Sequence, residues 1–161
     1  MVRVGITMYG LAPGPALRDR DDLIPAMSVK AQIALVKEPQ MGEGVSFGFN
    51  YRVAKPVQIA TIPLGYADGV SRRLSGRMKV LFRGFPCQQI GSICMDQMMI
   101  EIPLDYSSSE RRGLAEVGEE IVILGVQGDL EITADMMADE LETINYELTC
   151  GFGQRLPHIY V

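Results

Sequence analysis

The sequence MSVKAQIAL at residues 27–35 is the clearest structural pattern in the chain. Every second residue from Met27 to Leu35 is apolar, and the residues between them are mostly polar. A period of two places side chains alternately on the two faces of a strand, so one face can be buried while the other meets water. The stretch therefore predicts a half-buried β-strand.

Similar short stretches recur along the chain and are separated by Gly, Pro or Asp. Many short strands at close spacing favour an antiparallel sheet that closes on itself, because closure removes unpaired edges that promote aggregation. We expect a mainly β fold, a Greek-key β-barrel that is closed or nearly closed. The further predicted strands are Val2–Met8, Val45–Tyr51, Val57–Pro63, Met78–Arg83 with a turn at Gly84, Ile93–Ile102, Glu120–Leu124 and Leu156–Val161.

Helical signals are confined to one region near the C-terminus. Thr133 can cap a helix, and Asp135 in its first turn suits the helix dipole. A second short helix is predicted through Ile144–Leu148, ending near Gly151. One or two short helices are therefore expected beside the strands.

Residues 10–25, GLAPGPALRDRDDLIP, contain three prolines and a cluster of mixed charge. This composition is typical of an exposed connector rather than of regular structure. It divides the chain into a short N-terminal segment (1–10), a connector (11–25) and a main domain (26–161).

Composition excludes several classes of function. The 161 residues suffice for one domain with its own core. A total of 15 Lys and Arg against 20 Asp and Glu gives a net charge of −5, which argues against nucleic acid or an anionic membrane as a partner. No apolar run reaches the roughly 18 residues of a membrane span, and residues 1–10 lack the pattern of a signal peptide. We expect a cytoplasmic protein.

The cysteines and the histidine offer little chemistry. Cys87, Cys94 and Cys150 show no CxxC spacing, so we expect reduced, buried and unreactive thiols. Because His158 is the only histidine, neither a Ser-His-Asp triad nor a His-rich metal centre can readily be built. We expect no metal site.

Five motifs together carry a family resemblance: RVGITMYG at 3–10, VSFG at 45–48, PLGYADG at 63–69, ICMDQMMIEI at 93–102 and TINYE at 143–147. In this order they resemble the alanine racemases across nearly the whole chain. The resemblance implies that residues 1–10 are the last strand of a (β/α)8 barrel that binds pyridoxal 5'-phosphate, and that residues 26–161 are the C-terminal β-barrel domain. The lysine that anchors the cofactor would lie in that barrel, outside this chain.

The resemblance assigns four residues to the cofactor. Arg3 would point at the pyridine nitrogen, the backbone N–H groups of Gly5 and Ile6 would bind the phosphate, and Tyr146 would donate a hydrogen bond to it. Without the family, Arg3 is an ordinary surface or salt-bridge residue, and Tyr146 is a buried tyrosine with a satisfied hydroxyl.

The resemblance also implies a substrate-binding group. Met95 would line the site of the substrate carboxylate through its backbone N–H. Tyr66 and Arg72 would line the access corridor, where a positive charge attracts a carboxylate. The alternative for Arg72 is a charge on an exposed turn, and the ADG sequence at Asp68 is more typical of turn structure than of chemistry.

Two positions depart from the family pattern. Phe47 replaces the tyrosine of VSYG, whose phenol is the base on one face of the substrate, and a phenyl ring can neither accept nor give a proton. Ser92 replaces the arginine that is common in GRICMD, which removes a charge from the corridor. The family assignment therefore does not by itself imply activity.

We expect the C-terminal domain of an alanine racemase, which interconverts L- and D-alanine for peptidoglycan synthesis, with this chain alone inactive. The alternatives are a non-enzymatic β-barrel binding module, a catalytically disabled relative, and a related racemase or decarboxylase-like enzyme for another amino acid. In the family, each active site combines the barrel of one subunit with the β-domain of the other. The resemblance thus implies a homodimer, and a β-domain without its barrel should associate with itself or another partner.

Overall fold

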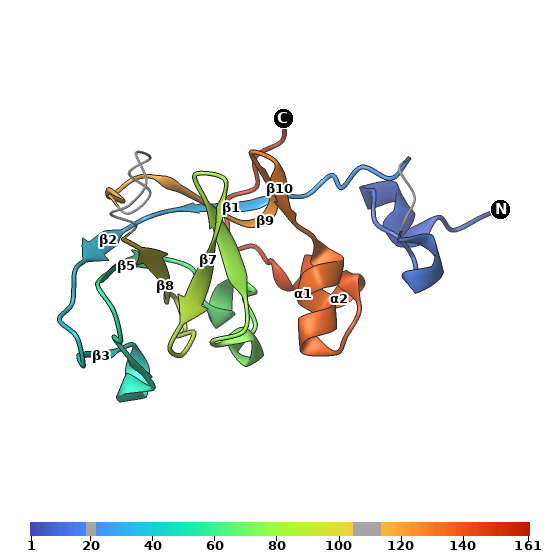
Figure 1. Cartoon of the computed structure of the whole chain (residues 1–161). Coiled ribbons are helices and arrows are strands. Elements are labelled where there is room, and N and C mark those ends of the chain that lie inside the picture. The colour runs from blue at the N-terminus through green and yellow to red at the C-terminus, as the bar shows by residue number, and fades with distance from the viewer. Residues whose placement is uncertain (19–21, 105–113) are drawn as a thin grey trace.

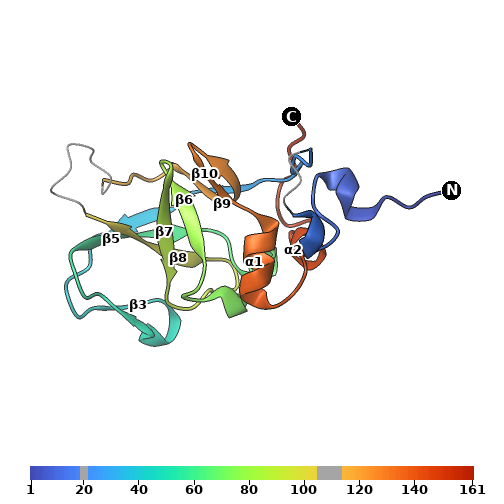
Figure 2. The same cartoon turned by 45° about the vertical axis from the view of Figure 1, so that its right-hand side comes forward.

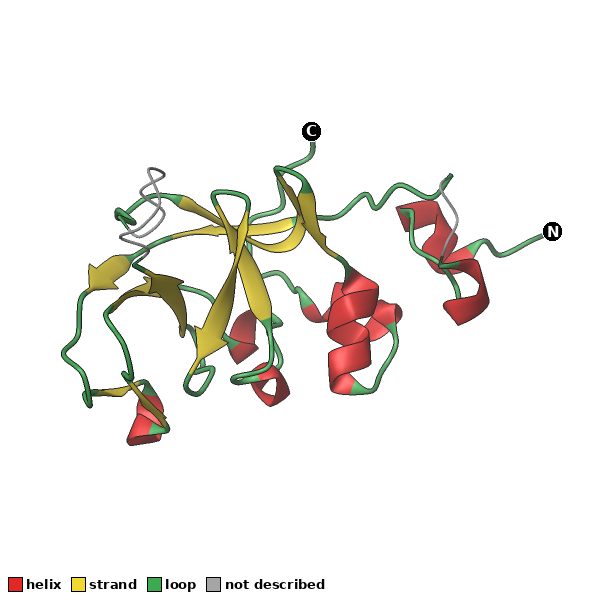
Figure 3. Ribbon diagram, in the orientation of Figure 1, coloured by secondary structure: helices red, strands yellow, loops and turns green. Residues whose placement is uncertain are grey.

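The computed structural model describes residues 1–18, 22–104 and 114–161. The fold is mainly β with two α-helices, as the sequence predicts (Figures 1 and 3). A small part of the predicted connector, residues 19–21, lies outside the described residues. Within the described ranges, no helix is long and apolar enough to cross a membrane.

An eight-stranded antiparallel sheet forms the body of the described chain. Neighbouring strands follow the order β1-β9-β6-β7-β8-β5-β2, and β10 pairs with β9. A separate hairpin consists of β3 (Gly44–Val45) and β4 (Tyr51–Arg52). The strands of the sheet are β1 (Val29–Gln32), β2 (Leu35–Lys37), β5 (Val57–Ile62), β6 (Lys79–Phe82), β7 (Phe85–Ile90), β8 (Met98–Pro103), β9 (Glu120–Gln127) and β10 (Leu130–Ile132).

The stretch at residues 27–35 forms two strands rather than one. β1 pairs with β9, whereas β2 pairs with β5. Between them the N–H of Ile33 donates to the carbonyl of Glu119, and the N–H of Ala34 donates to the carbonyl of Thr61, both at 2.9 Å. One continuous segment thus supplies both end strands of the order, because it changes partner at residues 33–34.

Both faces of β5 are covered, which explains its nearly continuous burial. Ala60 and Ile62 face the main core, whereas Val57 and Ile59 face a second apolar cluster together with Ile90. Side chains of the β3–β4 hairpin pack against that second cluster. Burying each such side chain contributes about 1.5–3 kcal/mol, so the cluster fixes the hairpin to the sheet.

Both predicted helices are confirmed. α1 spans Ala134–Leu141, and the Thr133 hydroxyl caps it by accepting a hydrogen bond from the N–H of Met136 at 3.1 Å. α2 spans Asn145–Gly151. Leu141 and Leu148 are buried, so the helix pair adds to the core.

The strand predicted at Val2–Met8 is wrong. Gly5–Tyr9 forms a short 3₁₀-helix that ends at Gly10, whose φ is 72°. A strand needs a neighbour for its N–H and C=O groups, and the sheet of the described residues contains no partner for this segment. Figures 1 and 2 show the N-terminal segment at the opposite end of the molecule from the β3–β4 hairpin.

The ends of the connector meet. A Cβ at Gly10 would lie 1.7 Å from the carbonyl oxygen of Ile24, so only glycine allows this approach. The N–H of Ala26 donates to the carbonyl of Tyr9 at 3.0 Å. The N-terminal segment is therefore tied directly to the start of the main domain.

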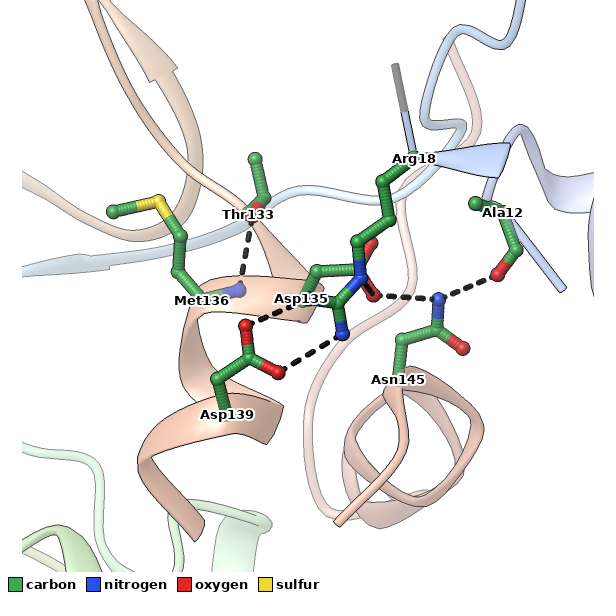
Figure 4. Close-up of polar contacts among 7 residues, drawn as sticks. All are labelled: Ala12, Arg18, Thr133, Asp135, Met136, Asp139 and Asn145. Carbon is green, nitrogen blue, oxygen red and sulfur yellow. Dashed lines mark hydrogen bonds and ion pairs between the residues drawn. The ribbon is translucent and has the colours of Figure 1, made fainter. Parts of the chain in front are cut away.

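The connector is also held on the helix pair (Figure 4). Arg18 donates two hydrogen bonds to the Asp139 carboxylate, at 2.8 and 2.9 Å, and its Nε lies 3.1 Å from Asp135. The Arg18 hydrogen bonds lower the pKa of Asp139. The buried Asn145 side chain donates to the carbonyl of Ala12 at 2.9 Å and to Asp135 at 3.1 Å. The connector is thus attached rather than freely exposed, because α1 and α2 supply its polar partners.

Three other predicted strands are wrong in part or entirely. At Val45–Tyr51 the chain turns, because Phe47–Phe49 forms a 3₁₀-helix between β3 and β4. Only the second half of Ile93–Ile102 is extended, as β8. Leu156–Val161 forms no strand, and its last three side chains are exposed.

Two strands escaped prediction. β7 has the sequence FPCQQI, in which Pro86 and two glutamines interrupt the alternation. β10 has only three residues. The predicted turn at Gly84 is confirmed by its φ of 78° between β6 and β7.

The expectation of three buried thiols holds only for Cys87. Cys94 is half-buried and Cys150, in the last turn of α2, is exposed. No pattern in a single sequence indicates that the side chain of Cys150, on a short helix near the C-terminus, is exposed.

Candidate functional site

The four residues predicted for the substrate side lie around one hollow. Phe47, Tyr66, Arg72 and Met95 line a cavity of about 410 Å³, together with Ser92, Ile93 and Cys94. These residues come from four separate segments of the chain, so the fold alone brings them together. Phe47, Tyr66 and Met95 are 75%, 44% and 55% exposed, which leaves them free to meet a ligand or another surface.

Two of these segments are joined by backbone hydrogen bonds. The N–H of Tyr66 donates to the carbonyl of Cys94 at 3.0 Å, and the N–H of Ala67 donates to the carbonyl of Met95 at 2.9 Å. A Cβ at Gly65 would lie 2.3 Å from the Cys94 oxygen, so glycine is needed for this approach. The turns of PLGYADG and ICMDQ therefore form one rigid wall.

Asp68 supports that wall from inside. Its buried carboxylate accepts a hydrogen bond from the N–H of Gly65 at 2.9 Å and another from Nε of Arg155 at 3.0 Å. The first bond closes the turn that carries Tyr66, and the second ties the turn to the C-terminal segment. The structural interpretation of Asp68 agrees with this geometry.

Phe47 stands on an unusual loop. Ser46 has a φ of 66°, Gly48 of 79° and Phe49 of 50°, so three residues around Phe47 have left-handed backbone. Such conformations cost free energy in non-glycine residues and occur where the surroundings enforce them. Here the Ser46 hydroxyl donates to the carbonyl of Ser92 at 2.8 Å, and the Asn50 amide donates to the Ser92 hydroxyl at 3.1 Å.

The charge of the hollow comes from Arg72, the first residue of a 3₁₀-helix at Arg72–Leu74. Ser71 caps this helix by accepting a hydrogen bond from the N–H of Arg73. Ser92, at the position where an arginine is common in the family motif, is 7% exposed and supplies a hydroxyl instead of a second cation. The hollow can thus attract a carboxylate at Arg72, whereas Phe47 offers it an apolar surface.

Of the four residues predicted for the cofactor, two meet at the main core, because Ile6 belongs to it and Tyr146 packs against it. Arg3 and Gly5 are exposed on the N-terminal segment, and Gly5 has a φ of 67°. Ile6 is buried and lines a different, apolar pocket of about 240 Å³, whose lining includes neither Arg3 nor Tyr146. Tyr146 is half-buried against the main core. Among the described residues, neither this pocket nor the hollow at Phe47 is lined by all four of them.

Polar residues that the sequence analysis did not single out support the hairpin. The Tyr51 hydroxyl donates a hydrogen bond to Glu101, and Nζ of Lys55 lies 2.9 Å from the same carboxylate. Burial, and then the hydrogen bond to Glu101, raise the pKa of Tyr51 to about 12. Burial raises the pKa of Cys87 to about 11, with a smaller effect from Glu101. The signal that could have indicated Glu101 is a lone carboxylate inside the apolar strand MMIEI.

No group of three or more His, Cys, Asp or Glu side chains among the described residues is placed to hold a metal ion.

Comparison with known proteins gives a consistent result. A sequence profile described as alanine racemase, C-terminal domain, matches residues 26–160. The alanine racemases of Symbiobacterium thermophilum and Synechocystis sp. are each 44% identical to this chain, over 99% and 100% of its length. The chain spans 41% of the length of each of these curated relatives.

Solved structures agree. The alanine racemase from Bacillus anthracis with bound L-Ala-P has a TM-score of 0.87 at 36% identity, over 98% of this chain and 39% of that chain. The alanine racemase from Streptomyces lavendulae has a TM-score of 0.86 at 39% identity, over 98% of this chain and 40% of that chain. From its profile match, its sequence identity and its fold, this chain belongs to the family of alanine racemase C-terminal domains.

Proposed function

We propose that this chain forms the substrate-side wall of an alanine racemase that interconverts L- and D-alanine with pyridoxal phosphate. The observation that carries the proposal is that Phe47, Tyr66, Arg72 and Met95, predicted from three separate stretches of the sequence, line one hollow. A (β/α)8 barrel that anchors the cofactor would complete the site, and the family suggests a cytoplasmic homodimer that supplies D-alanine for peptidoglycan.

Each lining residue has a physical role in this proposal. The Arg72 guanidinium attracts the substrate carboxylate, because it carries a permanent charge at an open hollow. The backbone N–H of Met95 binds that carboxylate, and the phenol of Tyr66 lines the approach. Arg3, Gly5, Ile6 and Tyr146 would serve the cofactor only after the N-terminal segment has found a partner.

The sheet also supports a barrel. Because β1 and β2 are parts of one segment, the two ends of the strand order are joined through residues 33–34. We infer that the sheet closes in this way, which would leave few exposed edges.

Phe47 limits what the proposed enzyme can do. Racemisation by two opposed bases needs a proton acceptor on each face of the substrate, and Phe47 cannot act as one. Losing a general acid or base costs about 10²–10⁴ in rate. The parent would therefore be slow, or would use water at that face.

This same observation favours a second candidate function. A domain that keeps the hollow but has Phe47 in it suits a binding module or a catalytically disabled relative. Reading the gene upstream of Met1 separates the two: an in-frame barrel with an early lysine supports the enzyme, and a genuine start without one supports the module. A related enzyme for another amino acid remains a third candidate, tested by comparing substrates.

The decisive experiment is Phe47→Tyr in the protein that joins this chain to its barrel. Racemisation in both directions should rise by about 10²–10⁴, because the phenol restores a proton acceptor. Phe49→Tyr is the matched control, since it adds a phenol to an exposed aromatic of the same loop that does not line the hollow. Equal rates in the two variants would contradict the proposed role of position 47.

A further inference from the structure

The loop Ser46–Asn50 carries Phe47, which lines the hollow, and the conformation of this loop is costly in free energy. Ser46 has φ 66° and ψ 175°, a region that is otherwise almost restricted to glycine. Phe49 also has a positive φ, of 50°. A loop of this kind keeps its shape only when contacts outside the loop hold it.

Those contacts converge on residues 91 and 92. The carbonyl of Ser92 accepts a hydrogen bond from the Ser46 hydroxyl at 2.8 Å, and the Ser92 hydroxyl accepts one from the Asn50 amide at 3.1 Å. A Cβ at Gly91 would lie 2.4 Å from the Cβ of Ser46, so the loop rests directly on Gly91. Ser46 and Asn50, at the two ends of the loop, therefore both bond to Ser92.

Ser92 is suited to this task by its position. It is 7% exposed, and it directly precedes the segment Ile93–Met95 that lines the hollow. A single residue thus connects the wall of the hollow with the loop that presents Phe47. An alanine would keep the carbonyl that Ser46 uses but would lose the hydroxyl that Asn50 uses.

We propose that Ser92 is a positioning residue that holds the side chain at position 47 against the hollow, through Ser46 and Asn50 on either side of it. The inference rests on the proposed function only for the catalytic role of the side chain at position 47 in the hollow. Its structural part concerns this chain alone. It also makes the two departures from the family motifs, Phe47 and Ser92, parts of one local unit.

The test uses the 161-residue chain with a fluorescent reporter. The chain contains no tryptophan, so Phe47→Trp introduces a single one at the position in question. In this background Ser92→Ala and Asn50→Ala should each lower the fluorescence anisotropy of the reporter. In the otherwise unaltered chain each should make the amide hydrogen of Phe49, which is bonded to the carbonyl of Ser46, exchange about fivefold faster. Ser92→Thr, which keeps a hydroxyl, should restore both values.

Controls separate this effect from general loss of stability. Ser28→Ala removes a hydroxyl beside Gly125 on β9, at a different part of the sheet, and should change neither value. The urea midpoint should stay close to that of the parent in Asn50→Ala, because Asn50 is exposed. Unchanged anisotropy and exchange in both Ser92→Ala and Asn50→Ala would overturn the proposal, even if Ser92→Thr packs poorly.

Kinetics distinguish this proposal from the proposed function. In the barrel-containing protein with Phe47→Tyr, adding Ser92→Ala should lower kcat about tenfold and leave KM within about twofold, because only the placement of the base changes. A loss confined to KM would contradict the positioning role. If that background shows no racemisation, the proposed function fails, while the reporter measurements still decide whether Ser92 holds the loop.

Discussion

The substrate-side and cofactor-side residues lie in differently supported parts of the molecule. Phe47, Tyr66, Arg72 and Met95 stand on turns that are joined within residues 44–98 by backbone and side-chain hydrogen bonds to residues 92–95. Arg3, Gly5 and Ile6 lie on a segment without a strand partner in the described chain, at the opposite end of the molecule from the β3–β4 hairpin next to Phe47 (Figures 1 and 2).

The difference shows which part of the site this chain can build by itself. A turn whose N–H groups and carbonyls are paired inside the domain keeps its shape without help. Residues Gly5–Tyr9, which have no neighbouring strand in the described chain, form a local 3₁₀-helix, in which backbone groups bond within the segment. We infer that the substrate-side hollow is preformed; under the proposed function, a barrel would complete the cofactor side.

The largest expected effect concerns the main core, to which Ile93 of the hollow also belongs. Ile100 is fully buried in β8, so Ile100→Ala should lower the free energy of unfolding by about 2–5 kcal/mol. Val4→Ala, on the exposed N-terminal segment, should change it by less than about 0.5 kcal/mol. Urea unfolding of both variants measures the two changes in the free energy of unfolding. Equal losses of stability would mean that the N-terminal segment contributes as much to folding as the main core does.

The next effect concerns the wall itself. Asp68→Ala leaves the N–H of Gly65 without its acceptor and should cost about 1–3 kcal/mol of stability. Asp68→Asn keeps an oxygen that can accept this bond, so it should cost less. Chemical denaturation measures both, and a neutral Asp68→Ala would show that the turn of Tyr66 is held by other contacts.

A smaller effect should appear at alkaline pH. The folded protein keeps the Tyr51 proton up to about pH 12, whereas the unfolded chain loses it near pH 10.0, so stability falls as the pH rises between these values. Tyr51→Phe should flatten this fall while retaining the ring in its apolar cluster. Cys87 contributes in the same direction from pH 9.0 to about 11 and remains in both proteins. An identical pH profile in the variant would contradict the assignment to Tyr51.

The smallest effect concerns the connector. Arg18→Gln removes the paired contacts to α1, so protease cleavage within residues 11–25 should accelerate while the melting temperature changes little. Arg83→Gln is the matched control, because Arg83 also makes a paired contact, with Glu119, but within the main domain. Faster connector cleavage in both variants would show that the Arg18 contacts are not what holds the connector on the helices.

The sequence predicted the elements that depend on local patterns. The mainly apolar stretch Val57–Pro63 and the cap at Thr133 indicated β5 and α1, because burial and capping depend on residues that are neighbours in the sequence. β7 was missed because Pro86 breaks its pattern, and the partner change at Ile33 was missed because it depends on two distant strands.

The prediction of the site residues succeeded and failed for the same physical reasons. The motifs identified Phe47, Tyr66, Arg72 and Met95, which the fold brings together. The Ser46 and Asn50 contacts to Ser92 join residues over 40 positions apart in the sequence, so no spacing rule indicates them. Arg3 and Gly5 could not be placed from the sequence because the conformation of their segment depends on what pairs with it.

Amide hydrogen exchange of this chain, compared with the same residues in the protein that includes its barrel, tests the central claim most directly. Residues 46–50 and 91–97 should exchange at the same rates in both proteins, whereas residues 3–9 should become protected only when the barrel is present. Two results would contradict this expectation: protection of residues 46–50 and 91–97 only in the presence of the barrel, or equal protection of residues 3–9 with and without the barrel.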